Sequence, residues 1–183
     1  MGNQTEPNLV RQTAAGSRPA FGLLVEPHLP RLIALATRML GSSHKAEDAV
    51  QDALASVWLS RLRLDPERAI GPYLTTVTLN KCRDRLRKHK AARFFGLDDG
   101  QSTLELPDTS PDLESAAASR EELRRLQAEI EKLPIRLREA LVIVAIDGRS
   151  QAEAASLLGT SEKAIETRVY RARKRLRERL ENY

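Results

Sequence analysis

Two stretches of the sequence concentrate the side chains that bind phosphate. Between Lys81 and Arg93 there are seven Lys or Arg residues and one acid, Asp84. The stretch 162–180 carries eight Lys or Arg residues. Cations at this density neutralise phosphates and release condensed counterions, so each stretch indicates a polyanionic partner. A basic surface that only aids solubility is the alternative for either stretch alone, but two of them in one chain favour DNA.

The second basic stretch follows a pattern typical of a helix-turn-helix. Ser150 and Glu153 have the spacing of a capping box, which opens a short helix to Leu158. Gly159 allows a sharp turn before the next helix, about 162–180, capped by Thr160 or Ser161. One side of that helix is apolar and predicted to pack, whereas the other carries residue types that contact base edges and phosphates. The predicted packed side is Ile165, Val169, Ala172 and Leu176.

Composition predicts an all-α fold. Only 4% of the 183 residues are aromatic, and apolar residues recur at helical spacing from about Pro27 to Leu40, after Ser42 or Ser43, and from about Gly71 to His89. With one cysteine, Cys82, and three scattered histidines, neither a disulfide nor a metal or cofactor site is expected, and no catalytic group is evident. Neither a membrane span nor an export signal is apparent, so a cytoplasmic location is expected.

Two small helical domains joined by a flexible acidic linker are the predicted organisation. Residues 1–20 are polar and contain Gly and Pro, which predicts a disordered tail. Residues 21–90 form the first predicted domain, 91–115 the linker, and 116–183 the second domain. Within the linker, residues 98–114 contain six acids and no base.

The order of these features resembles the bacterial sigma factors of the extracytoplasmic-function (ECF) group, the specificity subunits of RNA polymerase. In the first half the resemblance lies in the residues AEDAVQD (46–52), then Trp58, Tyr73-Leu74, Asn80 and DRLR (84–87). In the second half it lies in Leu133-Pro134, the helix-turn-helix and RVYRARKR (168–175). It covers about residues 21–90 and 116–180. The first domain is thus similar to sigma region 2 and the second to region 4.

The resemblance implies three binding surfaces. Asp48, Gln51 and Asp52 would dock on the β′ clamp helices of core RNA polymerase, whose β flap would be a further contact. The loop from about Leu62 to Gly71 would hold an unstacked base of the minus-ten promoter element. The residues implied to contact that element are Asn80, Lys81, Arg83, Asp84, Arg85, Arg87 and Lys88. Those implied to contact the minus-thirty-five element are Lys163, Glu166, Thr167, Arg168, Tyr170, Arg171 and Lys174.

Further expectations follow from the same resemblance. The acidic linker would thread toward the active-site and RNA-exit channels of the polymerase, and an anti-sigma factor would hold the protein inactive until a signal releases it. Glu166 replaces the usual basic or polar residue; it would either select a cytosine amino group or pair with Lys163 or Arg173.

The sequence leaves two alternatives to a promoter-specificity subunit. A stand-alone helix-turn-helix regulator would bind duplex DNA without polymerase, but it leaves residues 46–52 and the first basic stretch unexplained. A sigma mimic that titrates a regulator should carry a sensor domain and a degraded basic helix, and the sequence has neither. The sequence therefore favours the sigma factor.

Overall fold

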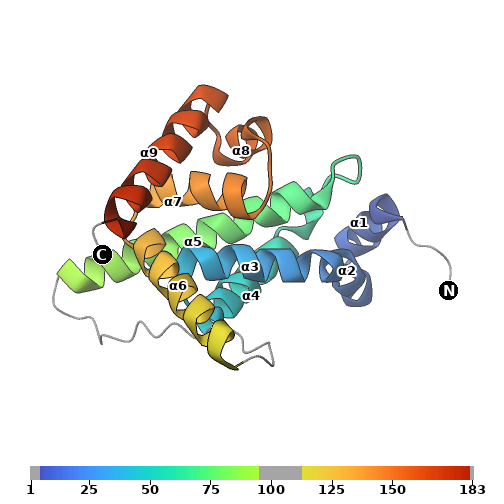
Figure 1. The fold of residues 1–183 in the computed structure, drawn as a ribbon. Coiled ribbons are helices and arrows are strands. Elements are labelled where there is room, and N and C mark those ends of the chain that lie inside the picture. Colours follow the sequence, from blue (N-terminus) through green and yellow to red (C-terminus); the bar gives the residue numbers. More distant parts are fainter. Residues whose placement is uncertain (1–4, 95–112, 182–183) are drawn as a thin grey trace.

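The computed structural model describes residues 5–94 and 113–181, with the side chains of 93–94 and 113–120 left aside (Figure 1). The part described consists of helices and contains no strand, which confirms the predicted all-α class. No helix in it is long and apolar enough to cross a membrane. The α-helices are α1 (Glu6–Ala14), α2 (Arg18–Val25), α3 (Leu29–Leu40), α4 (Ser43–Leu59), α5 (Ile70–Phe94), α6 (Leu113–Glu131), α7 (Ile135–Leu141), α8 (Gln151–Leu158) and α9 (Glu162–Leu180).

The first helical unit is built from α3, α4 and α5, whose apolar sides meet in a common core. Gly41 ends α3 with a φ of 73°, a conformation that glycine adopts without strain. Ser42 then caps α4 by accepting a hydrogen bond from the backbone N–H of Lys45 at 3.4 Å. Met39, Val57, Leu74 and Leu79 are among the side chains that fill the core.

Helix α5 differs in two respects from its prediction. It continues to Phe94, so the predicted linker, 91–115, begins inside a helix; residues 95–112 of that linker lie outside the described part. Tyr73 is one of the residues at helical spacing between Gly71 and His89, which predicts that it packs inward. It is exposed instead, and its hydroxyl lies 3.1 Å from the hydroxyl of Ser60. Thr75 and Thr78 are buried instead, and the Thr75 hydroxyl donates to the carbonyl oxygen of Gly71 at 2.9 Å.

The predicted disordered tail, 1–20, was wrong from Glu6 onward. Residues 6–14 and 18–25 form α1 and α2, and Leu9 and Val10 are buried in the main core. Burial of such side chains stabilises a fold by about 1.5–3 kcal/mol each, which offsets the ordering of a short helix. Pro7 and Pro19 lie in the first turns of the two helices, where proline is favourable rather than disruptive.

The second helical unit, from α6 to α9, contains the predicted helix-turn-helix. Ser150 and Glu153 form the capping box: the Ser150 N–H donates to the Glu153 carboxylate at 2.8 Å and lowers the pKa of that carboxyl. Gly159, with a φ of 58°, separates α8 from α9, and Ser161 caps α9 through the N–H of Ala164. All four predicted packing residues of α9 are buried.

The two helical units pack against each other, and α6 crosses the end of α3 (Figure 1). Val142 and Ile143, from the π-helical turn η3 (Val142–Ile146) after α7, belong to the same apolar core as Leu32 and Leu35 of α3. Because one core spans both units, the described part of the free chain forms a closed arrangement.

Arg138 joins the two units at the end of α3. Its guanidinium is buried and donates to the carbonyl oxygen of Met39, in the last turn of α3, at 2.7 Å. It also donates to the carbonyl oxygen of Glu131, the last residue of α6. Carbonyl oxygens at a helix C-terminus lack hydrogen-bond donors within the helix. The Arg138 guanidinium supplies such donors at the C-terminal ends of both α3 and α6. Burial lowers the pKa of Arg138.

Cys82 should resist alkylation while the protein is folded. It lies in the core on α5, and burial raises the pKa of its thiol to about 12. Because the thiolate is the nucleophile, we expect iodoacetamide at pH 8 to label the native chain at least about 100-fold more slowly than the chain in denaturant. Mass spectrometry of timed aliquots measures both rates. Equal rates would contradict the buried position.

Candidate nucleic-acid interface

The outward side of α9 presents the residues predicted to contact the minus-thirty-five element. Tyr170 is 67% exposed, and Arg171 and Lys174 are exposed beside it. Thr167 is half-buried, and its hydroxyl donates to the carbonyl oxygen of Lys163 at 2.8 Å. Since Ile165 and Val169 anchor the opposite side of the helix in the core, α9 offers a fixed row of donors to solvent.

Three further residues of this predicted set have partners within the protein. The Glu166 carboxylate pairs with Lys163 at 2.8 Å, one of the two outcomes foreseen for this acid. Arg168 is half-buried and lies 3.5 Å from the hydroxyl of Thr160, so it faces the turn rather than the exposed row. We therefore regard Tyr170 and Arg171 as the strongest candidates for base contacts.

The basic side of α5 is open toward its C-terminal end and partnered near its middle. Arg87 and Lys88 are exposed, and Arg87 approaches Asp84 of the same helix at 3.8 Å. An exposed pair of this kind contributes little energy and gives way readily to phosphate. Asn80 is exposed as well, with its side-chain oxygen 2.6 Å from the Arg83 guanidinium.

Arg83 is engaged by the second helical unit. Its Nε donates to the carboxylate of Glu139 in α7, whose side chain is only 5% exposed. A buried carboxylate needs a cation nearby, and Arg83 supplies it across the boundary between the units. Of the residues predicted to contact the minus-ten element, Arg83 is therefore the one that the closed arrangement occupies.

The predicted polymerase-binding acids lie on α4 beside the basic helix. Gln51 and Asp52 are exposed, and Asp48 is half-exposed. The Arg85 guanidinium lies 2.6 Å from the Asp52 carboxylate and 3.8 Å from that of Asp48. Arg85 thus faces the acids of α4, so the predicted DNA and polymerase surfaces adjoin at this residue.

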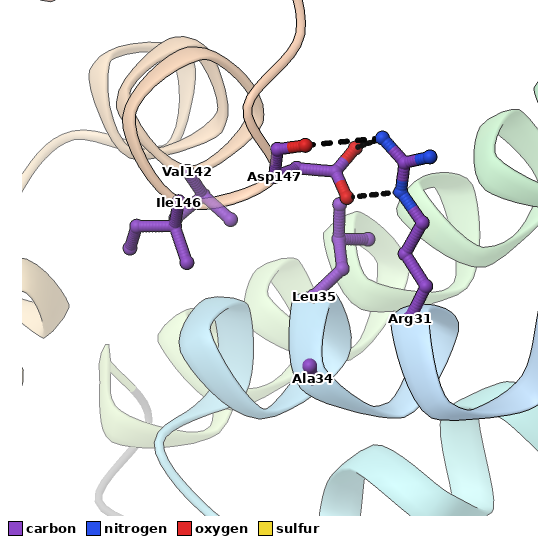
Figure 2. Close-up of a pocket in the computed structure, with 6 residues that line it drawn as sticks. All are labelled: Arg31, Ala34, Leu35, Val142, Ile146 and Asp147. Carbon is purple, nitrogen blue, oxygen red and sulfur yellow. Dashed lines mark hydrogen bonds and ion pairs between the residues drawn. The ribbon is translucent and has the colours of Figure 1, made fainter.

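A groove lies between α3 and η3, where the two units meet (Figure 2). Its volume is about 230 Å³; Leu35 lies on one side and Val142 and Ile146 on the other. At its rim the Arg31 guanidinium donates to both a carboxylate oxygen and the carbonyl oxygen of Asp147, each at 3.0 Å. This hydrogen bonding raises the pKa of Arg31. The groove has an apolar floor and an ion pair at its edge, with no arrangement of catalytic groups.

Sequence reasoning missed the residues that hold the two units together. Arg138, Glu139 and Asp147 read as ordinary surface charges, because charged residues are seldom buried. A weak signal was present, since Arg138 and Glu139 are flanked by the apolar residues Leu137, Ala140 and Leu141, but this pattern does not identify their partners. In the part of the chain that the structure describes, no group of three or more His, Cys, Asp or Glu residues is arranged to hold a metal ion.

The fold and the two basic surfaces define a class of protein: an all-helical DNA-binding protein with a helix-turn-helix and a second basic helix. Comparison with known proteins gives the family. Residues 24–92 match the model of sigma-70 region 2, and residues 123–176 match that of sigma-70 region 4. The chain belongs to the sigma-70 family of RNA polymerase sigma factors, in its extracytoplasmic-function group.

Individual relatives agree with this assignment. The chain is 38% identical to the RNA polymerase sigma factor CnrH of Cupriavidus metallidurans, over 92% of this chain and 90% of the relative. It is 32% identical to the ECF sigma factor SigM of Mycobacterium tuberculosis, over 94% and 83%. The solved structure of CnrH in complex with the cytosolic domain of CnrY superposes with a TM-score of 0.69 and 31% identity, covering 98% of this chain and 99% of CnrH.

Proposed function

We propose that this sigma factor binds core RNA polymerase through Asp48, Gln51 and Asp52 and directs it to promoters by two DNA contacts, α5 at the minus-ten element and α9 at the minus-thirty-five element. The observation that carries this proposal is the row of exposed side chains on α9. These are hydrogen-bonding and charged residues of the kind that contact base edges in the major groove, and the opposite side of the helix is fixed in the core. The chain supplies specificity to the polymerase and performs no catalysis of its own. Its place of work is the cytoplasm, alongside RNA polymerase.

Promoter binding at both elements requires the two helical units to separate. The minus-thirty-five and minus-ten elements are named for their positions relative to the transcription start, so they lie about 25 base pairs apart, which is roughly 85 Å of duplex. A compact chain of 183 residues is only about 40 Å across, from a radius of gyration of about 16 Å. The closed arrangement cannot span that distance. Opening would also free Arg83 from Glu139, so that its guanidinium can reach a phosphate.

A regulatory partner would act on the same two units. CnrH was solved in complex with the cytosolic domain of CnrY, and this chain resembles CnrH over nearly its whole length. We therefore propose that an anti-sigma factor holds this chain inactive and that an external signal releases it. The apolar groove beside Arg31 and Asp147 has contributions from both units, so a partner seated there would keep them together.

The test is transcription with purified components. The chain plus core RNA polymerase, on fragmented genomic DNA, is expected to give run-off transcripts from a discrete set of start sites. The double charge reversal Asp48→Arg and Asp52→Arg is expected to weaken association with core polymerase by at least about 10-fold, because it inverts the charge of both acids in the proposed contact. Glu26→Ala, which changes an exposed acid outside the proposed surface, serves as the control.

Two results would overturn this proposal. One is silence of the unsubstituted chain with core polymerase together with tight, specific binding of duplex DNA by the chain alone, which would identify a stand-alone regulator. The other is full association of the charge-reversed chain with core polymerase, which would show that the acids of α4 are not the contact.

A further inference from the structure

Helix α1 lies against the loop that connects α4 to α5, at one end of the first helical unit (Figure 1). We call residues 62–71 the promoter loop, because the resemblance to ECF sigma factors implies that they hold an unstacked base of the minus-ten element, to which the proposed function directs the polymerase. Leu9, Val10 and Thr13 of α1 are buried, so the helix is held to the core rather than loosely attached. It precedes the residues that match the region 2 family model, which begins at 24.

Two polar contacts connect α1 to the promoter loop. The Glu6 carboxylate accepts a hydrogen bond from the backbone N–H of Ile70 at 2.7 Å. Ile70 is the first residue of α5, and its N–H has no partner within the helix, so a carboxylate there also complements the positive end of the helix. Three residues earlier in the loop, the Glu67 carboxylate lies 3.3 Å from the Arg11 guanidinium; this pair is exposed and weaker.

Helix α2 holds the residues just before the loop. The rings of Phe21 and Trp58 are 5.4 Å apart in a tilted arrangement. The Arg18 guanidinium lies 5.9 Å from the Trp58 ring, and that of Arg61 lies 4.8 Å from it. Aromatic and cation–π contacts of this kind fix the side chain of the tryptophan. Helix α1 thus contacts the promoter loop itself, at Glu67 and Ile70, and α2 contacts Trp58 just before it.

We propose that α1 is a positioning element for the promoter loop and that Glu6 is its main positioning residue, setting how strictly the minus-ten element is read. This inference rests on the proposed function of the loop. A loop that is ordered beforehand rejects bases that do not fit it, whereas a loose loop can re-pack around several bases. Ordering the loop on binding also consumes part of the binding energy. Glu6 performs this ordering in the free protein, from a helix that lies apart from α9 (Figure 1).

The test compares Glu6→Ala, which removes the acceptor, with Glu6→Gln, which keeps an oxygen able to accept from the Ile70 N–H. For each variant, transcription is measured from a promoter of the protein and from copies with single base-pair changes in either element. We expect Glu6→Ala to lower discrimination in the minus-ten element by about fivefold, within the range for loss of a helix cap, and to leave the minus-thirty-five element within about twofold. Glu6→Gln should recover most of the discrimination.

Amide hydrogen exchange in the free chain gives a second measurement that needs no polymerase. Exchange in residues 62–70 should be faster in Glu6→Ala than in the unsubstituted chain, and nearly normal in Glu6→Gln and in the control Glu26→Ala. Unchanged exchange in Glu6→Ala, or a parallel loss of discrimination at both promoter elements, would overturn the inference. Failure of the unsubstituted chain to transcribe would instead overturn the proposed function, and the exchange result would still decide the role of α1.

Discussion

Replacing Arg171 by alanine is expected to lower transcription from the promoters of this protein by about 10- to 100-fold. Arg171 is exposed on α9, and an arginine that contacts a base edge contributes about 1–3 kcal/mol to discrimination. The loss should be greatest for promoters with the original minus-thirty-five base pair and smaller for promoters altered there. Run-off transcription on matched templates measures both. Association with core polymerase, measured by fluorescence anisotropy, should stay normal. Arg171 belongs to the second helical unit, whereas the proposed polymerase-binding residues are on α4 of the first.

Arg173→Ala provides the matched control for this prediction. Arg173 is on the same helix and equally cationic, but it directly follows the buried Ala172 and therefore lies on the flank of the exposed row. Its loss should weaken binding to all DNA sequences alike and reduce the salt dependence, without changing discrimination. Equal effects of the two substitutions would mean that α9 reads phosphates only. Parallel loss of DNA and polymerase binding in Arg171→Ala would mean that the exposed side of α9 is misassigned.

Replacing Arg138 by methionine is expected to destabilise the protein by about 3 kcal/mol, because the buried carbonyls of Met39 and Glu131 lose a charged donor. Methionine preserves most of the apolar volume, so the loss reports on hydrogen bonds rather than on a cavity. For a chain of this size the corresponding change in Tm is about 6–12 °C. Differential scanning calorimetry measures it directly.

Arg136→Met is the control, because Arg136 lies two residues earlier in α7 and is exposed. Its effect on Tm should stay below about 2 °C. A small effect of Arg138→Met, similar to that of Arg136→Met, would contradict the role of Arg138 as the residue that satisfies the ends of α3 and α6.

The local structure of this protein could largely be predicted from its sequence. The capping box of Ser150 and Glu153, the turn at Gly159 and the buried positions of α9 depend on neighbouring residues, so short-range rules were sufficient. The exposed candidates for DNA contact, Tyr170 and Arg171, follow from the same helical period.

Contacts between distant residues could not be predicted in this way. Pro7, Gly16 and Pro19 suggested disorder, whereas α1 and α2 form because Leu9 and Val10 find a core made by later helices. The burial of Glu139 depends on Arg83, which is 56 residues away and was expected to face DNA. Neither fact can be predicted from the local pattern, because the sequence around a charged residue or a proline does not show which distant residues will contact it in the fold.

On the proposed function, the Arg83 guanidinium has two competing anions, the Glu139 carboxylate and a promoter phosphate. While the carboxylate holds it, a phosphate cannot, so the apparent affinity for a promoter is reduced by the fraction of molecules that are closed. On the proposed function, core polymerase would raise DNA affinity simply by keeping the two units apart, without adding any contact to the DNA. The isolated sigma factor would thus bind DNA poorly because its own Glu139 carboxylate occupies Arg83, even when no inhibitor is bound.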